Sequence, residues 1–335
     1  MPDRPPLAGG PLAGGPRPSG DPLTAVDSTT REVLRRLELE VTRRLDGLLH
    51  GDHRGLVPGH GSELGETRRY APGDDVRRID WNVTARLQEP YIRQTIAERE
   101  LQTWLVIDRS SRMDFGTVNC EKRDVALAAA AAVGFLTARD GNQLGAVLAG
   151  RGAPTLIGAR GSRKHLLRIL HDLVETPRSD DSGITDLGLA LGRLAGVARR
   201  RGLVAVISDF GVSPGWQDRL AVTARRHDVL AIQISDPRDG ELPNVGVITV
   251  RDPATGQLRE LATHKASVRE EYAKAVESRQ NLLDATFREI RVDHLQLSTG
   301  RAWLDDLVEF VVHRQMMLAH RRGGTGAPTG TKGGR

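Results

Sequence analysis

The stretch Thr-Trp-Leu-Val-Ile-Asp-Arg-Ser-Ser-Arg-Met, residues 103–113, decides the fold. Its first five residues form an apolar run of strand length, and the run ends in a carboxylate followed closely by hydroxyls. From residue 101 onward, similar runs alternate with helical patterns. This alternation is typical of strands joined by crossover helices in a parallel sheet.

The predicted elements can be placed along the chain. Further strands are expected at residues 143–148, 203–208, 229–234 and 292–296, with residues 153–157 pairing with the second strand as a hairpin. Helices are expected at residues 122–139, 162–174, 186–200, 214–226, 264–288 and 302–320. The predicted fold class is therefore α/β, a Rossmann-like, mostly parallel sheet flanked by helices, preceded by an N-terminal helix and an irregular module.

Composition sets the domain boundaries. Residues 1–28 and 323–335 are rich in Gly, Pro and small residues, so we expect disordered tails there. Residues 29–100 hold an amphipathic helix over 31–49 and the irregular module, which has turn chemistry near residues 72–75 and extended segments around Tyr91. The sheet domain is expected over residues 101–300, with a C-terminal helix over residues 301–322.

Several function classes are disfavoured by composition. The longest apolar run, residues 125–136, is shorter than the ~20 residues of a membrane span. The N-terminus lacks the pattern of a secretory signal, so the expected address is the cytoplasm. A single cysteine gives no internal disulfide, and the net charge of +5 with 4% aromatic residues makes nucleic-acid binding a weak alternative.

One pattern imitates a hydrolase. Gly211-Val-Ser-Pro-Gly215 matches Gly-x-Ser-x-Gly and follows a predicted strand. The oxyanion hole of such a site uses the backbone N–H of the residue after the serine, and Pro214 has none. Ser213 is better interpreted as a helix N-cap with Pro214 at the first helical position.

Polar side chains follow the predicted strands. Asp108 and Ser110 follow the first strand, Asp209 follows the strand at 203–208, and Thr185 precedes a predicted helix. In open α/β sheets, ligands bind outside the carboxyl ends of the strands. Oxygen ligands converging there suit a hard cation such as Mg²⁺.

Two motifs resemble known families. The set Asp108-x-Ser110, Thr185 and Asp209 resembles the metal-ion-dependent adhesion site of von Willebrand factor A domains. The run Arg-Tyr-Ala-Pro-Gly-Asp-Asp-Val-Arg-Arg-Ile-Asp-Trp, residues 69–81, with Ala85-Arg86 after it, resembles the hallmark of the family called domain of unknown function 58. The resemblance implies a von Willebrand factor A-like core, a metal completed by an acidic group of a partner, and a MoxR-type AAA+ ATPase as that partner.

This chain departs from the adhesion pattern at its third position, where Arg112 replaces a serine. A guanidinium has only donors and cannot ligate a cation. Either Mg²⁺ binds through Asp108, Ser110 and Thr185, or Arg112 forms a salt bridge with the carboxylates in place of the metal. The residues expected to face a partner are Arg112, Asp186, Arg77, Arg78, Asp80, Trp81 and Arg86. Trp81 is also expected to anchor the irregular module on the sheet.

These observations predict a non-catalytic, protein-binding adaptor. Two alternatives stay open: a metal-dependent hydrolase that uses the same carboxylates, and a basic nucleic-acid-binding protein.

Overall fold

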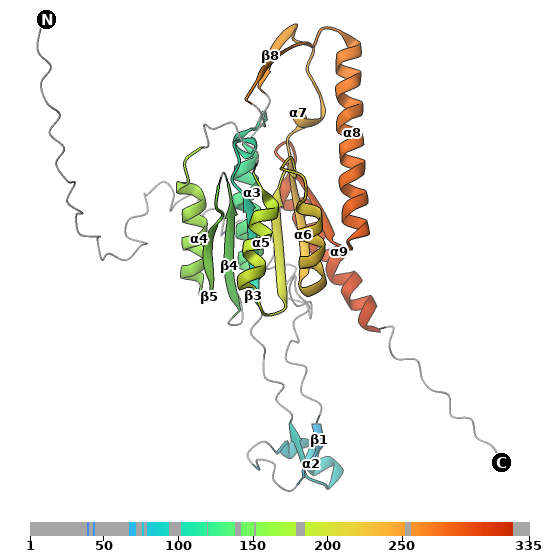
Figure 1. The fold of residues 1–335 in the computed structure, drawn as a ribbon. Helices are drawn as coiled ribbons and strands as arrows, with labels where there is room; N and C mark the ends of the chain where they lie inside the picture. The colour runs from blue at the N-terminus through green and yellow to red at the C-terminus, as the bar shows by residue number, and fades with distance from the viewer. Residues whose placement is uncertain are drawn as a thin grey trace, which may run out of the picture.

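Figure 1 shows the protein in a computed structural model that describes residues 39, 43, 67–71, 76, 79–93, 102–118, 120–137, 142–150, 152–178, 185–251 and 256–323. Side chains of the last helix are described up to residue 314. The expected helix over residues 31–49 and the expected tails lie outside these ranges, apart from residues 39, 43 and 323. Arg77 and Arg78 also lie outside them.

A six-stranded sheet forms the centre of the fold. Its strands are β3 (Gln102–Asp108), β4 (Gln143–Ala149), β5 (Thr155–Gly161), β6 (Gly202–Ser208), β7 (Asp228–Ser235) and β10 (Asp293–Ser298). Their order is β10-β7-β6-β3-β4-β5, and all neighbours are parallel except β5, which pairs antiparallel with β4. The expected α/β class, the von Willebrand factor A-like sheet and the hairpin at its edge are confirmed.

The central position of β3 and β6 follows from their composition. Every residue of β6 is buried, as is every residue of β3 after Gln102. The two strands pair directly, with Val106 beside Val206. Strands buried on both faces need a continuous apolar run, and each fully buried Val, Ile or Leu side chain contributes roughly 1.5–3 kcal/mol.

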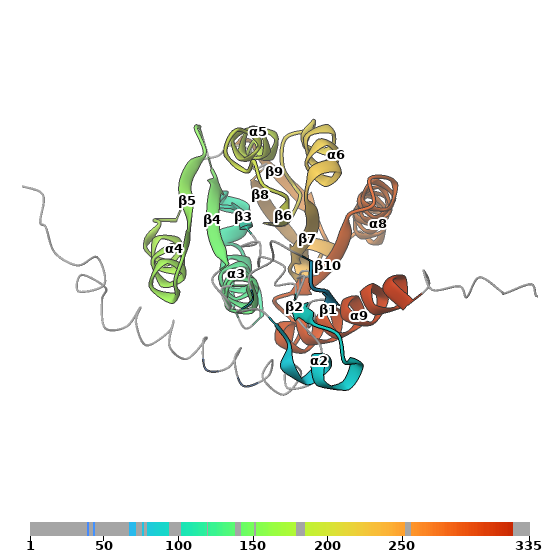
Figure 2. The same ribbon diagram turned by 90° about the horizontal axis from the view of Figure 1, so that it is seen from below.

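Helices cover both faces of the sheet, as Figure 2 shows. On one face lie α3 (Lys122–Thr137), α4 (Arg163–Glu175) and α9 (Trp303–Gly323), whose apolar residues join one core cluster with the sheet. On the other face lie α5 (Leu187–Val197), α6 (Trp216–Arg226) and α8 (Ala266–Glu289), which belong to a second cluster. The chain is therefore a three-layer αβα sandwich. No helix in the described part of the chain is both long and apolar enough to span a bilayer.

The irregular module contains more structure than the sequence predicted. It holds a two-stranded pairing of β1 (Thr67–Arg69) with β2 (Tyr91–Arg93), and the unpredicted α2 (Trp81–Leu87) between them. The expectation that Trp81 anchors this module on the sheet is wrong, because its side chain is 70% exposed. Trp81 is the first residue of α2, a helix with no buried residue, and Asp80 caps that helix by accepting from two backbone N–H groups.

A second addition lies between β7 and α8. It comprises the short α7 (Pro237–Gly240) and an antiparallel hairpin of β8 (Val247–Arg251) and β9 (Leu258–Ala262). Neither was predicted. In Figure 1 this addition lies at the same end of the molecule as the start of α8. It projects past the carboxyl ends of the parallel strands, the edge that carries the predicted site.

Candidate binding site at the carboxyl edge of the sheet

The two predicted carboxylates meet at the topological switch point of the sheet. The chain passes from β3 to β4 on one side, whereas β6, β7 and β10 lie on the other, so the switch falls between β3 and β6. Ligands of open α/β sheets bind in the crevice beyond this point. Asp108 is the last residue of β3, and Asp209 directly follows β6.

The Asp108 carboxylate is buried and held by two donors. It is 1% exposed, and it accepts from the Ser110 backbone N–H at 2.9 Å and from the Ser208 hydroxyl at 2.6 Å. Burial raises the pKa of Asp108 above its ordinary value, and the nearby charge of Asp209 raises it further. The Ser110 hydroxyl is shielded from solvent beside this carboxylate and makes no well-aligned hydrogen bond.

Asp209 has the opposite electrostatic environment. Its Oδ2 accepts from Arg112 Nε at 2.8 Å and from Lys122 Nζ at 3.1 Å, while its Oδ1 accepts from the Gly211 N–H at 2.8 Å. Burial raises the pKa of Asp209, but the charges of Lys122 and Arg112 together with these hydrogen bonds outweigh burial and hold it below the ordinary value. Asp209 is therefore an ionised carboxylate between two cations.

Lys122 is the residue of this charge cluster that sequence reasoning missed. It is 1% exposed and bridges two carboxylates, with Nζ 3.1 Å from Asp209 and 3.0 Å from Asp239 of α7. Lys122 is the first residue of α3, where the helix dipole disfavours a cation. A lysine at a helix start was the available signal, because it implies that nearby anions compensate for this placement.

Thr185 and Asp186 are the described residues of the loop that leads into α5. Thr185 is buried, and its carbonyl accepts from the Ser213 N–H at 3.2 Å, which ties this loop to the one after Asp209. Asp186 was expected to face a partner and to begin a helix. The helix α5 begins one residue later, at Leu187, and Asp186 is its partly exposed N-cap, with its side chain accepting from the Leu189 N–H.

The segment that imitates a hydrolase motif is a turn before α6. The prediction that Ser213 caps this helix and that Pro214 is its first residue is wrong. The N-cap is Gly215, and the helix begins at Trp216. Gly215 has a φ of 96°, a left-handed conformation that favours glycine, so the helix cannot extend back to Pro214.

A buried carboxylate on the far side of Lys122 fixes the surrounding loops. Asp236 accepts from the N–H and hydroxyl of Thr117, at 2.9 and 2.6 Å, and from the Thr299 hydroxyl at 2.5 Å. It also accepts from the Arg238 N–H at 2.9 Å. These four donors lie in the loop after β3, in α7 and in the loop after β10, so Asp236 joins three segments that surround the site.

The predicted oxygen ligands do not fit a resident divalent cation. Both oxygens of Asp209 already accept hydrogen bonds. The charges of Arg112 and Lys122 already neutralise the carboxylate that a metal would need. Within the described ranges, no group of three or more His, Cys, Asp or Glu side chains could hold a metal ion. Of the two geometries considered from the sequence, the Arg112–Asp209 salt bridge is the one present, reinforced by Lys122.

The fold and this edge define a Rossmann-like α/β protein with a polar, charge-paired crevice at its switch point. Residues 66–282 match the family described as "Protein of unknown function DUF58". The chain is also 47% identical over 289 residues to the uncharacterized protein Rv1480 of Mycobacterium tuberculosis, which covers 86% of this chain and 91% of that protein. An uncharacterized protein of Mycobacterium avium is 38% identical over 161 residues, 48% of this chain and 95% of its own. The chain belongs to the DUF58 family.

Solved structures with some likeness are distant in sequence. A conserved hypothetical protein BatB from Bacteroides thetaiotaomicron has 13% identity and a TM-score of 0.39, covering 64% of this chain and 99% of its own. The SpRpn10 VWA domain has 15% identity and a TM-score of 0.37, covering 63% and 94%. Because these TM-scores are below 0.5, the solved structures say nothing about the residues of the site in this chain.

Proposed function

We propose that the protein is a non-catalytic binding adaptor that presents the carboxyl edge of its sheet to a protein partner. The observation that carries this proposal is the meeting of Asp108, Ser110 and Asp209 at the switch point, with both carboxylates already held by a donor or a cation. These groups are buried, so they form a rigid polar floor beneath the edge, and Arg112 beside them is partly exposed. They are poorly suited to proton transfer, which needs a carboxylate free to exchange its proton.

The adhesion site is proposed to work without Mg²⁺. Arg112 and Lys122 supply the positive charge beside Asp209 that a divalent cation would supply. Arg112 is the more accessible of the two, since 23% of its side chain is exposed against 2% for Lys122. Arg112 therefore offers its remaining N–H groups to a partner, whereas Lys122 is structural.

The proposed partner is a MoxR-type AAA+ ATPase in the cytoplasm, as the family resemblance implies. On the α2 module, Asp80 is occupied as a helix cap, whereas Trp81 and Arg86 are exposed and available as a second contact surface. A metal-dependent hydrolase is less well supported, because the carboxylates it would use are occupied by internal donors.

Two titrations test the metal proposal. Calorimetric titration of Mg²⁺ and Mn²⁺ should give no binding heat for the wild type or for Asp108→Ala. Arg112→Ser alone should also give no binding heat, because Lys122 still neutralises Asp209. Arg112→Ser combined with Lys122→Met leaves Asp209 without a cation and should give saturable binding heat. Saturable heat in the wild type that is lost in Asp108→Ala would overturn metal-free action.

The partner proposal is tested with the purified full-length chain and a MoxR-type ATPase encoded in the same genome. We expect a complex by size-exclusion chromatography and light scattering, weakened by Arg112→Glu. The matched control is Arg193→Glu, an exposed residue of α5. No complex with the wild type, or equal binding by both variants, would contradict the proposed role of this edge.

A further inference from the structure

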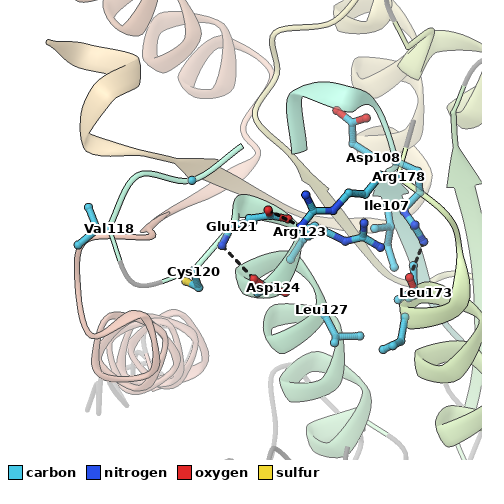
Figure 3. Close-up of a pocket in the computed structure, with 14 residues that line it drawn as sticks. Ile107, Asp108, Val118, Cys120, Glu121, Arg123, Asp124, Leu127, Leu173 and Arg178 are labelled. Atoms are coloured by element: carbon cyan, nitrogen blue, oxygen red, sulfur yellow. Dashed lines mark hydrogen bonds and ion pairs between the residues drawn. The ribbon is translucent and has the colours of Figure 1, made fainter. Parts of the chain in front are cut away.

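A large cavity opens beside Asp108 on the α3 side of the sheet. It has a volume of about 690 Å³ and lies between the start of α3 and the end of α4. We call it the α3–α4 pocket. Figure 3 shows Glu121, Arg123 and Arg178 converging on it, with Leu127 and Leu173 on its other wall. It therefore has one arginine-rich wall and one aliphatic wall.

Arg109 is the unusual residue of this pocket. Its guanidinium donates to the Leu173 carbonyl at 2.8 Å and to the Thr176 carbonyl at 3.1 Å, both at the end of α4. In the described part of the chain, no carboxylate lies within ion-pair distance of it. Arg109 is thus a half-buried cation that makes no ion pair with a described residue, although the charges of Asp114 and Asp108 act on it at longer range, and two of its five N–H groups donate to backbone carbonyls.

A second cation makes the local charge less favourable. Arg123 donates to the same Thr176 carbonyl at 3.0 Å, so the two guanidinium groups share one acceptor. Burial and, second, the charge of Arg123 lower the pKa of Arg109 to about 10, although the charges of Asp114 and Asp108 act in the opposite direction. Arg123 has a carboxylate partner in Asp114 at 3.0 Å, whereas Arg109 makes no ion pair among the described residues.

The mouth of the pocket is also basic. Arg178 is exposed there, and its contact with Glu121 at 2.6 Å is a surface ion pair that is readily exchanged for another carboxylate. The opposite wall includes the apolar side chains of Leu127, Leu173 and Val174. A ligand that satisfies both walls must carry an anionic group beside an aliphatic one.

We propose that the α3–α4 pocket binds an acidic, aliphatic segment of a protein partner, with a carboxylate of the segment on Arg109 and a leucine-like side chain against the aliphatic wall. The proposal rests on the proposed function, because Asp108 lines the pocket and makes it continuous with the partner-facing edge. A carboxylate fits the planar fork of an arginine in a bidentate manner. Its arrival would give Arg109 an ion pair that no described residue makes with it.

The test uses the full-length protein and the peptide acetyl-Leu-Glu-Leu-Glu-Leu-amide. Arginine side-chain Nε–H signals are followed by nuclear magnetic resonance during the titration. We expect saturable shifts at Arg109 and Arg123, and binding about tenfold weaker for the peptide with Gln in place of Glu. A peptide with Ser in place of Leu should also bind more weakly, because the aliphatic wall then has no partner.

Variants locate the binding. Arg178→Glu reverses the charge at the mouth without touching the core and should weaken the peptide about tenfold. Arg193→Glu, on the opposite face of the sheet, should leave binding unchanged. Arg109→Lys should bind less tightly than wild type because it keeps the charge and loses the fork. The absence of saturable shifts, or equal losses in Arg178→Glu and Arg193→Glu, would overturn the proposal.

Failure of this inference is distinguishable from failure of the proposed function. If the ATPase complex needs Arg112 but tolerates Arg178→Glu, the edge binds a partner and the α3–α4 pocket does not contribute. If the peptide binds through Arg109 while no ATPase complex forms, the pocket is real and the proposed partner is wrong. Equal binding of free acetate and of the peptide would show a simple anion site and overturn the peptide proposal.

Discussion

Replacing Lys122 with methionine should destabilise the protein through its electrostatics, because methionine keeps the apolar length of the side chain. The Lys122 side chain is 2% exposed. It contacts the side chains of Asp209, which is 4% exposed, and Asp239, which is 35% exposed. Breaking a buried pair by removing one partner costs roughly 3–5 kcal/mol. The contact with Asp239 adds little because that carboxylate is partly solvated. Arg112 remains on Asp209, so we expect the lower end, about 3 kcal/mol.

The expected change is measurable by thermal and chemical denaturation. For a folded unit of this size, ~3 kcal/mol lowers the Tm by about 6–12 °C. The loss should depend on pH with a definite sign. In the wild type the pKa of Asp209 is lowered, so its contribution is present above the unfolded pKa and is lost as pH falls through the folded pKa. Without Lys122 the folded pKa rises, so the gap between variant and wild type should narrow on acidification.

Two further variants keep this reasoning testable. Lys274→Met, at an exposed position of α8, controls for loss of a lysine and should change the Tm little. The double variant Lys122→Met with Asp209→Asn should lose less free energy of unfolding than the sum of the two single losses. The double variant lacks both the ammonium and the carboxylate, so neither is left buried without the other. A loss below about 1 kcal/mol for Lys122→Met, or one that is the same at pH 3 and pH 7, on either side of the unfolded pKa of Asp209, would refute the buried ion-pair interpretation.

Three other substitutions give distinct expectations. Asp108→Asn should change the free energy of unfolding at pH 7, measured by urea denaturation, by less than about 1 kcal/mol. The reason is that the pKa of Asp108 is raised, so its ionised carboxylate destabilises the fold. A loss as large as that of Lys122→Met would contradict this expectation. The pKa of His294 is lowered by burial, so stability should fall as pH drops below 6.5 towards the folded pKa, and His294→Gln should flatten part of that slope in thermal melts. Arg314→Met removes ion pairs at 2.8 Å to Asp228 and Asp293, so it should cost about 2 kcal/mol and speed amide hydrogen exchange in α9; unchanged exchange would show that α9 is held by its apolar face alone.

Much of the sheet was predictable because its signals are local. Strand lengths follow from short apolar runs, and the five expected parallel strands lie within two residues of those observed. The hairpin of β8 and β9 was missed although residues 247–250 of β8 form a short β-branched run, because β9 has no such run and both strands are largely exposed. The helix α2 was missed for a similar reason, since it buries no residue and shows no amphipathic period.

The candidate site was half predictable. Asp108, Ser110, Thr185 and Asp209 were found because each stands at a strand end or a helix start, positions that the alternating pattern reveals. Lys122 was not found, because it lies 87 residues from Asp209 in the chain. Only the docking of α3 against the sheet brings the ammonium to the carboxylate.

The sequence by itself determined the α/β class, the order of strands and helices and the family to which the chain belongs, because these depend on periodicity and on short motifs. Tertiary structure alone decided how the charges at the edge are paired: Asp209 pairs with Arg112 and Lys122, whereas Arg109 forms no ion pair with a described residue. The physical reason is that electrostatic energy depends on distance and burial between groups from separate elements. The number of residues between two groups in the sequence gives neither their distance in space nor their burial.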